Sequence, residues 1–350
     1  MRHIIIFSVC VVPFSCLTSN HHPPCTYSRI AKNAMSLSER FNLSDQMPEL
    51  RLNFYTAVGR YEWLHSGAQA LRGGFESALS SGNANMGFFC AVQATSFSIM
   101  SGEKKLTSLL KEIDYYLHLL ETYKSEVAKK YLLAFRETVS KLIDKGEETS
   151  IEAKECLGDV SDSGNKFIGT FYFHQAFRHF WLGYNERCCH FAQKCFGRIP
   201  QGKYLVCLIK FYYGLNLIDT LKKKMNAAKQ KEVDEIVTFM KVVVTHAGSN
   251  GRNKLELLEA EQYALAARHS EAVASYDAAI ASAKKSKFTH EQGLACEKAG
   301  FYFKMIGRAQ NALLYFQQAH ACYEEWGSTV KVEVIQRELD ELNSIVTNNT

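Results

Sequence analysis

One pattern of small and aromatic residues occurs twice in the last hundred residues, and the two copies lie forty positions apart. Each copy has a small residue followed three positions later by an aromatic one, and then a small–aromatic–small triplet at intervals of four and three. The first copy comprises Ala260, Tyr263, Ala272, Tyr276 and Ala279, and the second comprises Gly300, Phe303, Ala312, Phe316 and Ala319. Because intervals of three and four place side chains on one face of an α-helix, each copy predicts two short helices joined by a turn. A repeated helical hairpin of this kind constrains the fold of the whole chain.

The small residues of this pattern are predicted to mark close contacts between helices, and the aromatic residues to fill the space against the next helix. The second copy continues the same spacing to Tyr323 and Trp326. Apolar stripes at helical spacing form cores far more often than they bind cofactors. We therefore interpret all of these positions as packing residues of the repeat.

The composition of the chain also favours helices. Its 350 residues include only 5 prolines, although proline makes up about 5% of average proteins. Since proline breaks helices, and few windows alternate with the period of a strand, we expect no sheet. The predicted fold is all-α, a right-handed α-solenoid of tetratricopeptide-like helical hairpins.

Helical periodicity divides the chain into three predicted regions after a leader of residues 1–28. N-terminal helical hairpins are expected over 29–144, an exposed loop rich in Glu, Asp, Ser and Gly over 145–166, and tetratricopeptide-like repeats over 167–345. Outside the two copies, individual helices are predicted at 52–64, 68–79, 86–100, 106–123, 127–143, 167–182, 204–221, 233–244 and 330–342. The last of these has a polar outer face and is interpreted as the cap that a solenoid needs for solubility.

The beginning of the chain and the cysteines predict different compartments. A charged start followed by the apolar run 4–17 is similar to a secretory signal, although the cleavage site is poor. The 11 cysteines, an odd number without framework spacing, favour free thiols in a reducing compartment. We predict a cytoplasmic protein. The alternatives are a secreted helical protein, if residues 1–19 are a true signal, and an incorrectly placed start.

The charge of the chain excludes some classes of partner. The net charge of +5 at pH 7 is small and spread out, so it does not predict nucleic-acid binding. The apolar run is too short to span a membrane, so stable insertion is not expected. Two lysine groups follow apolar helical runs, where cations complement the helix dipole; the alternative is a patch that binds phosphate or acidic groups. These groups are Lys222, Lys223, Lys224, Lys229 and Lys231, and Lys284, Lys285 and Lys287.

The sequence contains no recognisable catalytic, cofactor or metal motif. It has no phosphate-binding glycine loop, no nucleophile elbow and no zinc-protease motif. One group has the side-chain types of a metal site, but its members are expected on different helix faces, unlike zinc ligands. This group is Cys188, Cys189, His190 and Cys195, with His174 and His179 on the preceding helix. We predict no catalytic residue, no cofactor and no metal.

The last fifty residues resemble a known helical region. Three segments carry the resemblance: Gly300 with Phe301 and Tyr302, the run 309–319, and Tyr323-x2-Trp326-Gly327-x3-Lys331, which is the most specific. They are similar to the tetratricopeptide-like region of large multi-domain signalling proteins that also contain an AAA-type ATPase, a GAF domain and a sensor histidine kinase. The resemblance implies a part that binds partners or relays signals. The activities of that family belong to modules that this sequence lacks.

The repeat and the lack of catalytic motifs together predict a non-catalytic helical-repeat scaffold. We expect it to mediate protein–protein interaction in intracellular signal transduction. The first alternative is a fragment, or a separately encoded regulatory segment, of a multi-domain ATPase or histidine kinase. An unknown enzyme on an all-helical scaffold is a further alternative, because active sites are defined by geometry and not by fold.

Overall fold

The computed structural model describes residues 32–33, 35–41, 46–58, 62–144, 166–199 and 204–348. Within these ranges the regular structure is helical and contains no strand. The prediction of an all-α fold is confirmed. The predicted leader of residues 1–28 and the predicted loop of 145–166 lie outside the described residues, except that Lys166 is the first residue of a helix.

From α5 to α8 and from α12 to α17 the helices follow one another with short connections. In chain order they are α4 (Met47–Val58), α5 (Leu64–Ser80), α6 (Ala84–Ser101), α7 (Leu106–Tyr123), α8 (Glu126–Ile143), α10 (Lys166–Trp181), α11 (Asn185–Cys195), α12 (Tyr204–Lys223), α13 (Ala227–Leu265), α14 (His269–Lys285), α15 (Thr289–Met305), α16 (Ala309–Trp326) and α17 (Thr329–Asn348).

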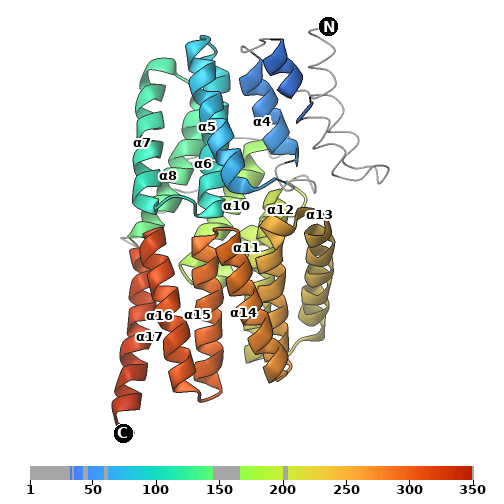
Figure 1. Ribbon diagram of the computed structural model, residues 1–350, viewed down its shortest axis with the longest axis vertical. Helices are drawn as coiled ribbons and strands as arrows, with labels where there is room; N and C mark the ends of the chain where they lie inside the picture. Colours follow the sequence, from blue (N-terminus) through green and yellow to red (C-terminus); the bar gives the residue numbers. More distant parts are fainter. Residues whose placement is uncertain are drawn as a thin grey trace.

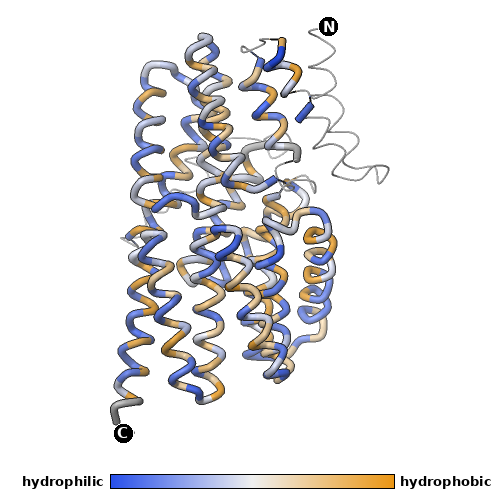
Figure 2. Tube along the Cα trace, viewed as in Figure 1, coloured by the Kyte–Doolittle hydropathy of each residue, from blue (hydrophilic) through white to orange (hydrophobic). Residues whose placement is uncertain are grey.

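Neighbouring helices form hairpins, and the hairpins lie in two groups along the long axis of the molecule (Figure 1). Helices α4 to α8 lie at one end and α12 to α17 at the other, with α10 near the middle. Within the groups α5 packs on α6, α13 on α14, and α15 on α16, while α8 contacts α10 and α17 and so joins the two ends. Figure 2 shows hydrophilic and apolar residues interspersed along most helices, as expected for helices with one buried face.

Two helices are apolar on nearly all sides and lie inside the fold. The helix predicted at 86–100 as an inner helix is α6, which is buried from Gly87 to Ser101 with few exceptions. Among the described residues, α12 alone is long and apolar enough to cross a membrane, and 83% of its apolar window is buried inside the protein. Its apolar composition is thus explained by its position in the core.

The turns of the C-terminal hairpins recur at regular positions. Backbone φ is positive at Ala267, Lys287, Gly307 and Gly327, with values of 55°, 57°, 75° and 86°. Each of these residues follows a helix end and reverses the chain, which is the usual place for a left-handed residue. The forty-residue period seen in the side chains is therefore also present in the backbone.

Two predicted helices differ in length from those of the structure, one shorter and one longer. The helix predicted at 52–64 is interrupted, because α4 ends at Val58 and α5 begins at Leu64. The helix predicted at 233–244 lies in the first arm of α13, which reverses direction at Ala247 (φ −134°, ψ 46°), so the second arm, up to Leu265, is a separate helix. The two arms lie side by side, because Gln262 donates a hydrogen bond of 2.9 Å to Asp234 and the Lys241 ammonium lies 3.1 Å from Glu259. The prediction of a separate helix is therefore confirmed, although that helix is longer than 233–244.

An aromatic cluster occupies the junction of the two groups of helices. The Trp181 and Trp326 rings lie 4.9 Å apart, and His290 lies 5.4 Å from Trp181. A side-chain carbon placed on Gly102, at the end of α6, would come within 2.3 Å of the His290 ring. The aromatic richness of the helix predicted at 167–182 is therefore used to join α10 to the C-terminal hairpins.

Candidate functional site

The residues predicted as repeat packing lie mostly in the core. All of them are buried except Tyr263, which is partly exposed and has the Arg268 guanidinium 4.5 Å from its ring centre. The buried set is Ala260, Ala272, Tyr276, Ala279, Gly300, Phe303, Ala312, Phe316, Ala319, Tyr323 and Trp326. The closest approach is between α15 and α16, where a side-chain carbon on Gly300 would lie 2.6 Å from the Phe316 ring. A side chain at position 300 would therefore have to displace the Phe316 ring, which glycine avoids.

The two copies differ in the pair of side chains that joins their helices. In the first copy the Tyr276 hydroxyl donates a hydrogen bond of 2.5 Å to the buried carboxylate of Glu261. At the positions forty residues later, the Phe301 and Phe316 rings pack edge to face, with their centres 5.1 Å apart. The polar pair of one copy is thus replaced by an apolar pair in the other.

A groove of about 440 Å³ opens beside these pairs. It is formed by the end of α10, the start of α11, the C-terminal half of α12, one face of α15 and the start of α17. The lining residues are Phe180, Trp181, Gly183, Asn185, Asn216, Asp219, Lys222, Lys223, Leu294, Glu297, Lys298, Phe301, Tyr302, Met305 and Lys331. The volume is within the range of ligand-binding clefts in proteins.

Most charged groups of the groove are held in ion pairs. The Lys298 ammonium lies 2.7 Å from an Asp219 carboxylate oxygen, and the Lys222 ammonium lies 2.5 Å from Glu261. Burial acts to lower the pKa of Lys298, but the negative charges of Asp219 and Glu261 outweigh it and raise the pKa above its ordinary value. Lys298 therefore keeps its positive charge at all physiological pH values.

The most specific element of the family resemblance encloses one carboxylate of the groove. The Tyr323 hydroxyl donates a hydrogen bond to Glu297, and the Lys331 ammonium lies 2.7 Å from the same carboxylate. Burial and the charge of Glu297 raise the pKa of Tyr323 well above its ordinary value, so the tyrosine stays a hydrogen-bond donor. Gly327, between them, adopts the left-handed conformation that ends α16. The element thus fixes Glu297 and the start of α17 at the edge of the groove.

Apolar and amide groups complete the groove. The Phe301 and Met305 side chains, one turn apart on α15, are 37% and 64% exposed. Asn216 on α12 is 1% exposed and its amide lies beside the Cys188 thiol, but neither its amide nitrogen nor its amide oxygen has a nitrogen or oxygen hydrogen-bond partner within the described part of the chain. An unsatisfied buried amide is unfavourable, and a ligand that offers one donor and one acceptor would relieve this.

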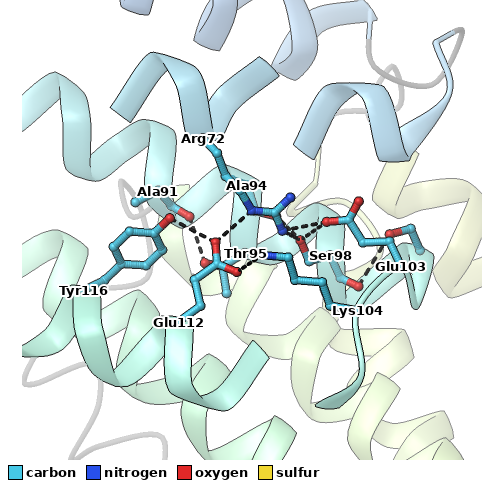
Figure 3. Close-up of polar contacts among 10 residues, drawn as sticks. Arg72, Ala91, Ala94, Thr95, Ser98, Glu103, Lys104, Glu112 and Tyr116 are labelled. Carbon is cyan, nitrogen blue, oxygen red and sulfur yellow. Dashed lines mark hydrogen bonds and ion pairs between the residues drawn. The ribbon is translucent and has the colours of Figure 1, made fainter. Parts of the chain in front are cut away.

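A second polar cluster, in the N-terminal hairpins, has a structural role (Figure 3). The Arg72 guanidinium on α5 contacts Glu112 on α7 at 2.8 Å and Glu103 at 2.6 Å. Lys104 and Tyr116 also donate to the Glu112 carboxylate. Burial would raise the pKa of Glu112, but the hydrogen bonds and charges of Lys104 and Arg72 lower it below its ordinary value. Each charge is satisfied by its neighbours, which leaves no group free for a ligand.

The cysteine–histidine group does not form a metal site. Among the described residues, no three or more His, Cys, Asp or Glu side chains are placed to hold a metal ion. Cys188 and Cys195 are buried on one face of α11, whereas Cys189 is partly exposed and His190 is exposed. Burial raises the pKa of Cys195 to about 12 and of Cys189 to about 11. Thiols with pKa values this high are poor nucleophiles at neutral pH.

No family model matches the chain, and no curated protein matches it.

Apart from the aromatic residues, Lys331, and Lys222 with Lys223, for which binding of acidic groups is the alternative role, the groove residues were not predicted from the sequence. A signal was present, because Asn216, Asp219 and Lys223 on α12 follow intervals of three and four, as do Leu294, Lys298 and Phe301 on α15. These mixed polar and apolar stripes look like the edges of an ordinary buried face. Only the packing of α12 beside α10, and the ion pair that joins α12 to α15, show that they border one cavity.

Proposed function

We propose that the protein is a non-catalytic helical-repeat protein that binds an extended, acidic segment of a partner protein in the groove between α10, α12, α15 and α17. The hairpins are proposed to be tetratricopeptide-like and to form a right-handed solenoid, of which the groove is the inner face. The resemblance of residues 290–342 to helical regions of signalling proteins supports a role in intracellular signal transduction. The observation that carries the proposal is the buried Asn216 amide at the groove, which has no nitrogen or oxygen hydrogen-bond partner among the described residues.

The chemistry of the groove matches a peptide in three ways. A peptide bond offers one N–H donor and one C=O acceptor, which are the partners that the Asn216 amide lacks. Four lysines and two carboxylates line the groove, so its net charge is positive and favours acidic side chains. The exposed parts of Phe301 and Met305 offer an apolar surface, and Met adapts to ligands of varied shape.

The state of Lys223 sharpens the preference for acidic segments. Lys222, Lys298 and Lys331 are each paired with a carboxylate of the protein. Lys223, in contrast, is exposed and has no ion pair among the described residues. It is therefore the cation of the groove that is free to bind an acidic side chain of the partner.

Selection of peptides from a random display library with the full chain tests the proposal. Acidic sequences are expected to be enriched, and their affinity is then measured by fluorescence anisotropy. Lys223→Glu is expected to weaken binding by about tenfold, which corresponds to about 1.4 kcal/mol. Met305→Ala and Asn216→Leu should also weaken it, the first through lost apolar contact and the second through lost hydrogen bonds.

Two matched variants control for indirect effects. Lys231→Glu makes the same charge change on an exposed residue of α13, and Leu314→Ala removes an apolar side chain of α16 that is 58% exposed and does not line the groove. Both should bind the selected peptides like the parent chain. If no peptide is enriched, or if the groove variants bind as well as these controls, the proposed function is wrong.

A further inference from the structure

A second cavity, of about 500 Å³, lies between three segments that are far apart in the sequence. It is lined by Trp63 before α5, by Gly248, Ser249 and Arg252 of α13, and by Ser282, Lys285 and Ser286 at the end of α14. The proposed peptide groove shares no residue with it. Lys285 belongs to the second lysine group of the sequence, for which a phosphate- or acid-binding role was the alternative to a helix-dipole role.

Hydrogen bonds between the three segments build the walls of this cavity. The Trp63 indole N–H donates to the Ser286 carbonyl oxygen at 3.0 Å, and the neighbouring His65 ring bonds to the Lys287 carbonyl oxygen at 3.1 Å. On the α13 side, the Asn250 amide donates to the Glu62 carbonyl oxygen. These contacts fix the position of the cavity walls before any ligand binds, which lowers the entropic cost of binding.

Both charged side chains that line the cavity, Arg252 and Lys285, are positive. Arg252 and Lys285 are exposed, and neither has an ion pair or a side-chain hydrogen bond within the described part of the chain. The other polar groups of the cavity are the serine hydroxyls and the Trp63 indole. Among the described residues that line the cavity there is no Asp or Glu. Cations that share a cleft without a counter-charge repel each other and concentrate anions there.

We propose that this cavity binds a phosphate monoester, with the phosphate between Arg252 and Lys285. The planar Arg252 guanidinium can bind two phosphate oxygens at once, and Lys285 adds a mobile point charge. Serine hydroxyls can donate to the third oxygen, because each carries one rotatable O–H group. The Trp63 ring, which is partly exposed, provides a flat apolar wall for the group that carries the phosphate.

Trp63 also provides the signal for a binding experiment. The other two tryptophans, Trp181 and Trp326, are 2% and 1% exposed, and Trp181 lines the peptide groove, so a change in fluorescence that is lost in Trp63→Phe reports on Trp63. The full chain is titrated with phenyl phosphate, with inorganic phosphate, and with one serine-containing peptide in its phosphorylated and unphosphorylated forms. Saturable changes are expected with the phosphorylated probes and not with the unphosphorylated peptide. Trp63→Phe should abolish the signal, while calorimetry still detects binding.

Charge reversal distinguishes a site from general attraction of anions. Arg252→Glu and Lys285→Glu are each expected to weaken binding of the phosphorylated probes by about tenfold or more, because each removes a charge-assisted contact and adds repulsion. Lys231→Glu, the same change elsewhere on α13, should alter it by less than about twofold. Circular dichroism shows that each variant is folded, and Arg252→Gln and Lys285→Gln replace any reversal variant that is not.

The probes also identify the source of the phosphate. Tighter binding of the phosphopeptide than of inorganic phosphate would indicate a phosphorylated protein segment as ligand, and equal binding would indicate a small phosphate compound. The proposal is overturned if no probe gives saturable binding, or if Lys231→Glu weakens binding as much as Arg252→Glu. Either result leaves the peptide groove untouched, since the cavities share no lining residue.

Discussion

The two copies of the forty-residue pattern have the same helical framework but different chemistry at one contact. In both, small residues let the helices meet, and the hairpin turn has a left-handed residue, Ala267 in the first copy and Gly307 in the second. The contact that joins Glu261 to Tyr276 in the first copy is formed by Phe301 and Phe316 in the second. The framework therefore requires size and spacing, while polarity at the contact is free to change. That freedom allows one repeat to place Glu261 beside Lys222 and the other to expose Phe301 in the groove.

Introducing a charge into the shared framework should have the largest effect. Ala312 and its counterpart Ala272 are both completely buried. Ala312→Asp is expected to reduce the free energy of unfolding by about 3 kcal/mol or more, because it buries an unpaired charge at a helix contact. Ala272→Asp should cost a similar amount if the two copies are equivalent in packing. Chemical denaturation followed by circular dichroism measures both, and an unchanged midpoint for either would show that its helix does not pack as described.

The contact that differs between the copies predicts unequal costs for truncation. Glu261→Ala leaves the Tyr276 hydroxyl buried without an acceptor and is expected to cost about 2–3 kcal/mol. Phe301→Ala should cost less, about 1–2 kcal/mol, because the ring is already 37% exposed.

A double replacement tests whether the contact itself is interchangeable. Glu261→Phe with Tyr276→Phe gives the first copy the apolar pair of the second, and replacing a buried polar pair by apolar groups is often neutral or stabilising. We expect the double variant to be more stable than Glu261→Ala. A double variant less stable than Glu261→Ala would show that the carboxylate is needed to hold Lys222.

The framework could be predicted from the sequence because it depends on local spacing. Intervals of three and four at Ala272, Tyr276 and Ala279 indicate both the helix and its buried face. The groove could not be predicted in the same way. Asp219 and Lys298 are 79 positions apart, and their ion pair exists only because α12 lies beside α15. The same holds for the cavity at Trp63 and Ser286, which are 223 positions apart.

Substitutions at the closest helix crossing of each copy should change stability by an intermediate amount. Gly300 occupies the place of Ala260, and a methyl group there would meet the Phe316 ring at 2.6 Å. Gly300→Ala is therefore expected to cost about 1–3 kcal/mol by overpacking, although alanine favours helices. Ala260→Gly should cost only about 1 kcal/mol, through the flexibility of glycine. Thermal denaturation of the two variants measures the difference. A Gly300→Ala variant as stable as the parent chain would mean that Phe316 moves aside without cost.

The smallest expected effect concerns the turn between the helices of each copy. Ala267 has φ 55° and its counterpart Gly307 has φ 75°. The left-handed conformation costs a residue with a side chain about 1–2 kcal/mol, and glycine avoids this cost but loses more entropy on folding. Ala267→Gly should therefore stabilise the protein by about 0.5–1 kcal/mol, and Gly307→Ala should destabilise it by a similar amount. A methyl group on Gly307 would have no neighbour within 4 Å, so the second effect can come only from the backbone.

Chemical denaturation of both variants and of the double variant tests whether the two turns are equivalent. Opposite shifts that cancel in the double variant would show that the two turns are equivalent, and shifts of the same sign would show that they are not.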